Sequence, residues 1–175
     1  MENFLETYPI FEEDPTKTVE PGLPAELAAL LDQVNSNSYA NGFFKFVTPQ
    51  TFRPYCALWN LDPDRCFPFL KSAFGHLILF HEGQYKAINP VFNDIDVLGE
   101  QDELDFVMNV LLCDRSSLEA SFFIDIYEQT FPRLGPPKLD EIYAFVPALG
   151  LGGSQTAENV QKVNMEQQML ILSQL

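Results

Sequence analysis

Hydrophobic residues change their spacing along the chain, and each change predicts a different kind of element. After Pro24, Leu27, Leu30, Leu31 and Val34 follow helical spacing and predict an amphipathic helix. From residue 67 to residue 98 the apolar runs become short and rich in β-prone side chains. They predict four strands, at Phe69–Phe74, Leu77–His81, Gln84–Asn89 and Asp94–Leu98. The Glu-Gly step at 82–83 predicts a hairpin with a glycine at positive φ, so we expect an antiparallel meander.

Helical spacing returns after this meander. A helix is predicted from about Asp102, and another is predicted to start at a Ser116 or Ser117 cap and to run to Phe131. Asn164, followed three residues later by Gln167, predicts the cap of a terminal helix that carries Met165, Met169, Leu170 and Leu172. Helices, strands, helices, one strand and a last helix together predict an α+β fold, in which helices pack on a mostly antiparallel sheet in one compact unit.

The segment from Asp140 to Ser154 is the most unusual stretch of the sequence. Alternating side chains predict a strand that Pro147 ends, and an apolar loop with Gly150, Gly152 and Gly153 follows. So many glycines predict close backbone packing. The loop matches neither a Walker loop nor a dinucleotide fingerprint, and no lysine or arginine lies between residues 138 and 162, so nucleotide binding is not expected.

Charge limits the partners of this protein. The sequence has 25 acidic and 10 basic residues, a formal net charge of −15. Such a field repels nucleic acid and anionic membranes and accelerates encounter with a basic protein, although acidity that serves only solubility is an equal alternative. We expect the first partner-binding cluster at Glu100, Asp102, Glu103 and Asp105, and a second at Glu12, Glu13 and Asp14. For the first cluster, stabilisation of a helix N-terminus is the competing interpretation.

Neither a secretory signal nor a run of about 18 apolar residues is found. The cysteines are three in number and widely spaced, which is typical of a reducing compartment, so we expect a cytoplasmic protein.

Residues with catalytic or metal-binding chemistry are few. His76 and His81 with Cys56 and Cys66 match no spacing of paired metal ligands, and each cysteine fits a core position better than a catalytic one. A serine-hydrolase elbow is also missing from the sequence. We therefore expect no metal, no cofactor and no enzymatic activity.

Two parts of the sequence resemble known families. Residues 140–154, DEIYAFVPALGLGGS, with residues 158–163 and Leu170-Ile171-Leu172, resemble the C-terminal domain of Tdi-type immunity proteins. Residues 23–27, residues 39–44, Trp59-Asn60 and Ala73-Phe74-Gly75 resemble the GAD-like domain that forms the N-terminal part of that family. The order of elements is also loosely similar to the SUKH group. Departures include Asn35-Ser36-Asn37-Ser38 in place of a glycine-containing turn, and Ala144 in place of a glycine.

This resemblance implies a GAD-like region at residues 1–100, a Tdi-type region at residues 101–175, and protection against a type VI secretion DNase toxin. The acidic clusters would then bind a basic nuclease domain. Two alternatives stay open: an enzyme that reverses toxin damage, and a small-ligand-binding or regulatory domain without a toxin partner.

Overall fold

The computed structural model describes residues 2–175 and contains one large antiparallel sheet. Its strands are β1 (Ile10–Glu12), β2 (Ser38–Tyr39), β3 (Phe44–Phe46), β4 (Cys66–Ser72), β5 (Leu77–His81), β6 (Gln84–Asn89) and β7 (Asp94–Glu100). They hydrogen-bond in chain order, and a separate pair joins β8 (Glu141–Phe145) to β9 (Val160–Asn164). The predicted meander and the α+β class are thereby confirmed.

The hairpin between β5 and β6 has the predicted turn. Phe80 pairs with Tyr85 and His81 with Gln84, so Glu82 and Gly83 alone form the loop. Both have positive φ, 52° and 82°, the geometry that matches the twist of a two-residue hairpin.

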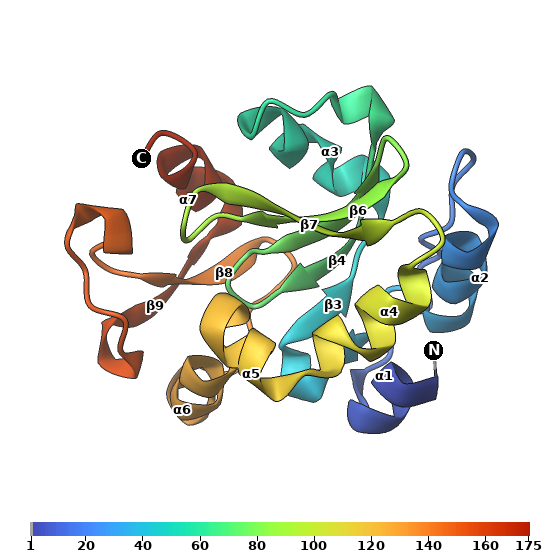
Figure 1. Cartoon of the computed structure of the whole chain (residues 1–175). Helices are drawn as coiled ribbons and strands as arrows, with labels where there is room; N and C mark the ends of the chain where they lie inside the picture. The colour runs from blue at the N-terminus through green and yellow to red at the C-terminus, as the bar shows by residue number, and fades with distance from the viewer. Residues whose placement is uncertain (1) are drawn as a thin grey trace.

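Helices cover both faces of the large sheet. They are α1 (Glu2–Thr7), α2 (Ala25–Val34), α3 (Pro49–Leu58), α4 (Leu104–Asn109), α5 (Arg115–Ser117), α6 (Ile124–Leu134) and α7 (Met165–Leu172). Figure 1 shows α3 on one side of the sheet and α4 to α6 on the other. Leu77 and Leu79 face the core under α3 and α7, whereas Ile78 and Phe80 face the larger core on the opposite side. Both faces of β5 are buried, in agreement with the unbroken apolar run from Leu77 to Phe80.

The larger core joins the two halves of the chain. Phe74 of the turn after β4 packs against Tyr143 and Phe145 of β8, with ring centroids 5.7 and 5.4 Å apart. No described helix is long and apolar enough to cross a membrane.

The prediction of a single helix capped by Ser116 or Ser117 is wrong in two respects. Asp114 is the cap, because its carboxylate accepts hydrogen bonds from the Ser117 N–H at 2.8 Å and from both serine hydroxyls. The helix is also interrupted: α5 passes into a π-helical turn at Leu118–Phe122, and Phe123 adopts a left-handed φ of 61° before α6 begins. Phe123 is fully buried against Phe74, so core packing overrides the helical propensity of this segment.

The structure adds two details to the predictions for the C-terminal region. Leu170 is 49% exposed on α7, whereas Met165, Met169 and Leu172 form its buried face. In the glycine loop, close backbone approach is found at Gly153, where an added Cβ would lie 1.8 Å from the Pro147 carbonyl oxygen; around Gly152 nothing lies that close.

Candidate partner-binding surface

The negative charge of this protein is concentrated in one segment. Between Lys86 and Arg115 the sequence contains no basic residue, yet it contains seven acidic residues. They are Asp94, Asp96, Glu100, Asp102, Glu103, Asp105 and Asp114. Strand β7, the turn after it and α4 hold the first six, so six of the 25 acidic residues and no basic residue lie on one strand, one turn and one helix.

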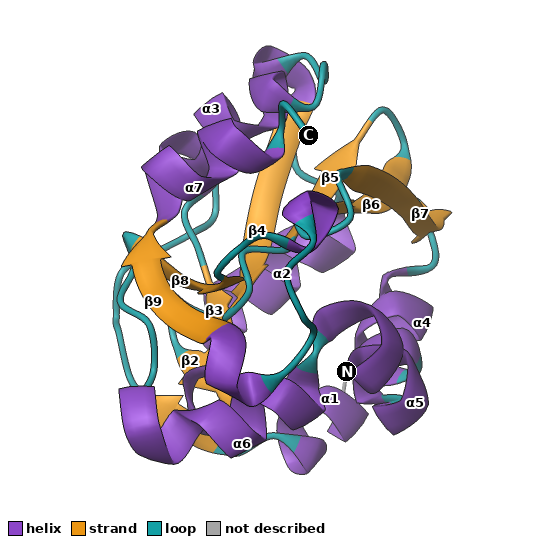
Figure 2. Cartoon of the chain, turned by 90° about the vertical axis from the view of Figure 1, so that its left-hand side faces the viewer, coloured by secondary structure: helices purple, strands orange, loops and turns teal. Residues whose placement is uncertain are grey.

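Strand β7 forms an edge of the large sheet. In the described chain it pairs only with β6, which leaves its other backbone edge without a strand, and Figure 2 shows it at the margin of the molecule. A bulge near Leu98 shifts the register between Tyr85 and Lys86. Val97 is 58% exposed, and the acidic side chains of the strand are exposed with it. Burial and the neighbouring Asp94 raise the pKa of Asp96.

Helix α4 adds an exposed apolar strip next to these acids. Phe106 and Val110 are 43% and 50% exposed, and their spacing of four places them on one face of the helix. The opposite face, with Leu104, Val107 and Met108, is buried in the larger core. An apolar strip bordered by charged side chains is the composition of a protein–protein interface, with an apolar centre and a polar rim.

Intramolecular hydrogen bonds hold most of the first predicted cluster in place. The Glu103 carboxylate accepts a bond from the backbone N–H of Glu100 at 2.8 Å, and the Glu100 carboxylate accepts one from the Gln84 amide at 3.1 Å. Asp105 accepts a bond from the Asn109 amide at 2.6 Å. Asp102 is exposed and makes no hydrogen bond or ion pair with the described residues. Part of the cluster therefore stabilises the entry into α4, yet all four carboxylates stay at the surface.

The second predicted cluster lies at the other end of the strand order, at and after β1. Glu12 and Glu13 are exposed. Asp14 is half-buried and forms an ion pair with Lys45 at 3.3 Å, and hydrogen bonds from Thr16, with the Lys45 ammonium, lower its pKa. The strand order does not bring the two predicted clusters together.

Sequence reasoning missed Asp94 and Asp96 of β7 and the exposed apolar residues Phe106 and Val110. The lack of any lysine or arginine between residues 86 and 115 could have identified Asp94 and Asp96. Phe106 and Val110 could not be separated from core residues, because apolar residues at helical spacing normally face the interior.

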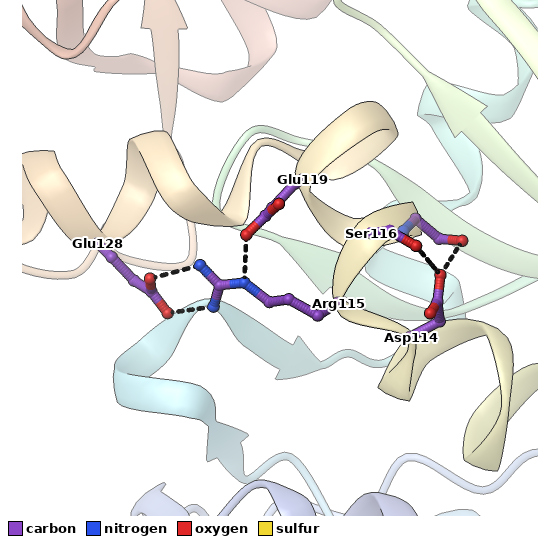
Figure 3. Close-up of polar contacts among 6 residues, drawn as sticks. Asp114, Arg115, Ser116, Glu119 and Glu128 are labelled. Carbon is purple, nitrogen blue, oxygen red and sulfur yellow. Dashed lines mark hydrogen bonds and ion pairs between the residues drawn. The ribbon is translucent and has the colours of Figure 1, made fainter.

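A second polar cluster, at the start of α5, is satisfied internally (Figure 3). The Arg115 guanidinium donates two hydrogen bonds to Glu128 of α6, at 2.7 and 2.8 Å, and a third to Glu119 at 2.6 Å. This pairing lowers the pKa of Glu128. Because Arg115 connects the segments on either side of the break at Phe123, its evident role is to fix α5 against α6.

Next to Arg115 lies a cavity of about 430 Å³, which Tyr8, Cys113 and Tyr127 also line. Burial raises the pKa of Tyr8 to about 12, so its phenol stays protonated at neutral pH. The Cys113 thiol has a raised pKa for the same reason.

The histidines and the other cysteines are buried. Burial lowers the pKa of His76 to about 3, and its Nδ1 lies 2.8 Å from the Ser72 hydroxyl oxygen. Cys56 of α3 and Cys66 of β4 are fully buried in the smaller core, and no group of three or more potential metal ligands occurs within residues 2–175.

Comparison with known proteins relates the C-terminal region to one family. Residues 106–175 match the family model described as "T6SS immunity protein Tdi1, C-terminal", which confirms the resemblance of this region. Among solved structures, the fold is similar to the crystal structure of Atu4351 from Agrobacterium tumefaciens. That match has a TM-score of 0.74 and 21% sequence identity, and it covers 99% of this chain and 88% of the other. No curated protein matches the sequence. The GAD-like assignment and the boundary at residue 100 stay predictions.

Proposed function

We propose that the chain binds and neutralises a cognate secreted toxin, because residues 106–175 match the family model of the C-terminal part of the type VI secretion immunity protein Tdi1. In this proposal the protein acts by stoichiometric binding in the cytoplasm and not by catalysis. The family match carries the proposal, and the charge distribution suggests where the toxin binds.

The surface formed by β7, the following turn and α4, residues 94–110, is the proposed binding surface. Val97, Phe106 and Val110 supply exposed apolar area, and the six acids of the same segment surround it with negative charge. Apolar anchors contribute most of the affinity of a protein interface, whereas charges at its rim mainly accelerate association. Glu12 and Glu13 would form a secondary contact.

The proposed partner is a nuclease domain. An enzyme that binds DNA presents a cationic cleft, because it has to neutralise phosphates. A surface with six acids and no base is complementary to such a cleft and would compete with DNA for it.

A DNA-degradation assay with the purified toxin, which we expect the gene next to this one to encode, tests the proposal. If the protein binds stoichiometrically, cleavage falls linearly with added protein and stops at an equimolar ratio. Protection at far lower ratios would contradict stoichiometric binding and favour the enzymatic alternative. If the toxin neither co-purifies with the protein nor is inhibited by it, the proposed function is wrong.

A further inference from the structure

Three of the ten basic residues of this acidic protein line one small cavity. Lys45 of β3, Lys71 of β4 and Lys138 of the loop before β8 surround a space of about 110 Å³, together with Ser38 and Glu12. This cavity lies at the β1–β4 end of the sheet and shares no residue with the proposed toxin-binding surface at residues 94–110, although Glu12 in its lining is also a proposed secondary toxin contact.

The strand register explains why these residues meet. Glu12 pairs with Ser38, Ser38 with Lys45, and Lys45 with Lys71, so one row crosses four strands. Directly paired residues project from the same face of a sheet. Two lysines in direct cross-strand contact repel each other, and a bound anion would relieve that repulsion.

Lys71 is buried, and its ammonium contributes positive charge to the cavity but has no hydrogen-bond donor left for a ligand. Its ammonium donates to the backbone carbonyls of Lys138, Leu139 and Glu141, at 3.0, 3.0 and 2.8 Å. Burial lowers its pKa to about 7, while the nearby Asp140 opposes that shift.

The other groups around the cavity have donors to spare. Lys45 makes one side-chain contact, the ion pair with Asp14, and the exposed Lys138 ammonium makes none with the described residues. Ser38 is only 3% exposed, and its buried hydroxyl has no hydrogen-bond partner in residues 2–175. Buried hydroxyls normally have a partner, so this one indicates a missing acceptor.

We propose that this cavity binds one compact tetrahedral oxyanion of the size of phosphate or sulfate. Lys45, Lys138 and Ser38 donate hydrogen bonds to it, and the buried Lys71 ammonium adds positive charge. A water molecule takes up roughly 30 Å³, so the cavity has room for about four waters, enough for such an ion but too little for a nucleoside. Anion binding at this site does not require the toxin.

A substitution at Glu12 is expected to change the anion affinity in the opposite direction to a substitution at a lysine. The Glu12 carboxylate lines the cavity and repels an anion, so removal of its charge should strengthen binding, whereas removal of a lysine should weaken it.

Calorimetric titration of the full-length protein with sodium phosphate and with sodium sulfate, at ionic strength held constant with sodium chloride, tests the site. We expect saturable binding of one ion per chain. Lys138→Met and Ser38→Ala should each weaken it, the former about tenfold, and Glu12→Gln should tighten it several-fold. Lys17→Met, at an exposed lysine outside the cavity, is the matched control and should bind as the wild type does.

Heat that does not saturate, or that chloride reproduces at the same ionic strength, would overturn the proposal. An equal loss of anion affinity in Lys138→Met and Lys17→Met would also overturn it. So would an anion affinity that does not change in Glu12→Gln. Lys138 is exposed and Glu12 lies on a short edge strand, so these variants are expected to fold, which circular dichroism would verify.

Discussion

The two ends of the large sheet use charge in opposite ways. At the β7 end, six acids lie on a strand, a turn and a helix without any base among them, and all six are exposed. At the β1–β4 end, lysines face a small cavity, and one of them is buried and fully hydrogen-bonded. Charge that is exposed and left unbalanced is available to a partner, whereas buried charge must be satisfied within the fold. The difference separates a surface that we assign to binding from a cluster that first serves the structure.

Loss of the buried lysine should have the largest effect. Lys71→Met removes the shared donor of three part-buried carbonyls, and a hydrogen bond to a charged group contributes about 1.5–3 kcal/mol. Relief of the buried charge offsets part of that cost, so we expect the free energy of unfolding to fall by about 3 kcal/mol in urea titrations. Lys138→Met, at an exposed lysine of the same cavity, is the control and should change stability by less than about 0.5 kcal/mol. Equal stability of the two variants would show that Lys71 has no structural role.

Substitution of the exposed Phe106 by an acid should have the next largest effect, and it should change the affinity for the toxin without changing stability. Phe106→Asp removes the largest apolar side chain of the proposed surface, and loss of such an anchor typically costs 2 kcal/mol or more, which is about a 30-fold rise in the toxin Kd. Leu151→Asp, at a residue 61% exposed in the glycine loop, is the matched control. If both variants bind the toxin as tightly as the wild type, α4 is not at the interface.

Charge reversal should slow association. Lysines in place of Glu100, Asp102, Glu103 and Asp105 are expected to reduce the association rate constant about tenfold at low salt, with a smaller effect at 0.5 M salt, because rim charges steer the encounter. The control carries lysines in place of Glu26, Asp32, Asp64 and Glu166, four exposed acids outside residues 94–110. Its net charge is identical, so similar rates for the two variants in stopped-flow experiments would mean that total charge matters and its location does not.

The smallest effect, counted per pH unit, concerns the pH dependence of stability. Lys71 has a folded-state pKa of about 7, below the ordinary value of about 10.4 for an unfolded chain. The unfolded protein therefore binds more protons between these values, so this residue makes stability rise with pH by roughly 1 kcal/mol per unit above pH 7. The free energy of unfolding of the wild type and of Lys71→Met should be measured from pH 7 to pH 9. The value for the wild type minus that for the variant should increase steadily with pH. A difference that does not vary with pH would contradict a neutral-range pKa for Lys71.

Local sequence signals predicted much of the fold. The Glu-Gly turn and the short β-prone runs identified β5 and β6 with their register, and Leu27, Leu30, Leu31 and Val34 identified α2. The break at Phe123 could not be predicted, because its cause is contact with Phe74, distant in sequence.

The sites were predictable only in part, for the same reason. Charge counting predicted a cluster at Glu100 to Asp105, which stays a prediction, and it could not show that Phe106 and Val110 are exposed. The lysine cavity depends on the pairing of Lys45 with Lys71, which is a property of strand register between segments far apart in the chain.

Hydrogen–deuterium exchange of the full-length protein, free and in an equimolar mixture with its toxin, tests the central claim most directly. Our account predicts that toxin binding slows amide exchange in residues 94–110, where β7 offers an unpaired edge and α4 an exposed apolar strip, and leaves exchange around Lys71 unchanged. Slower exchange elsewhere, with none in residues 94–110, would contradict the assignment of this surface.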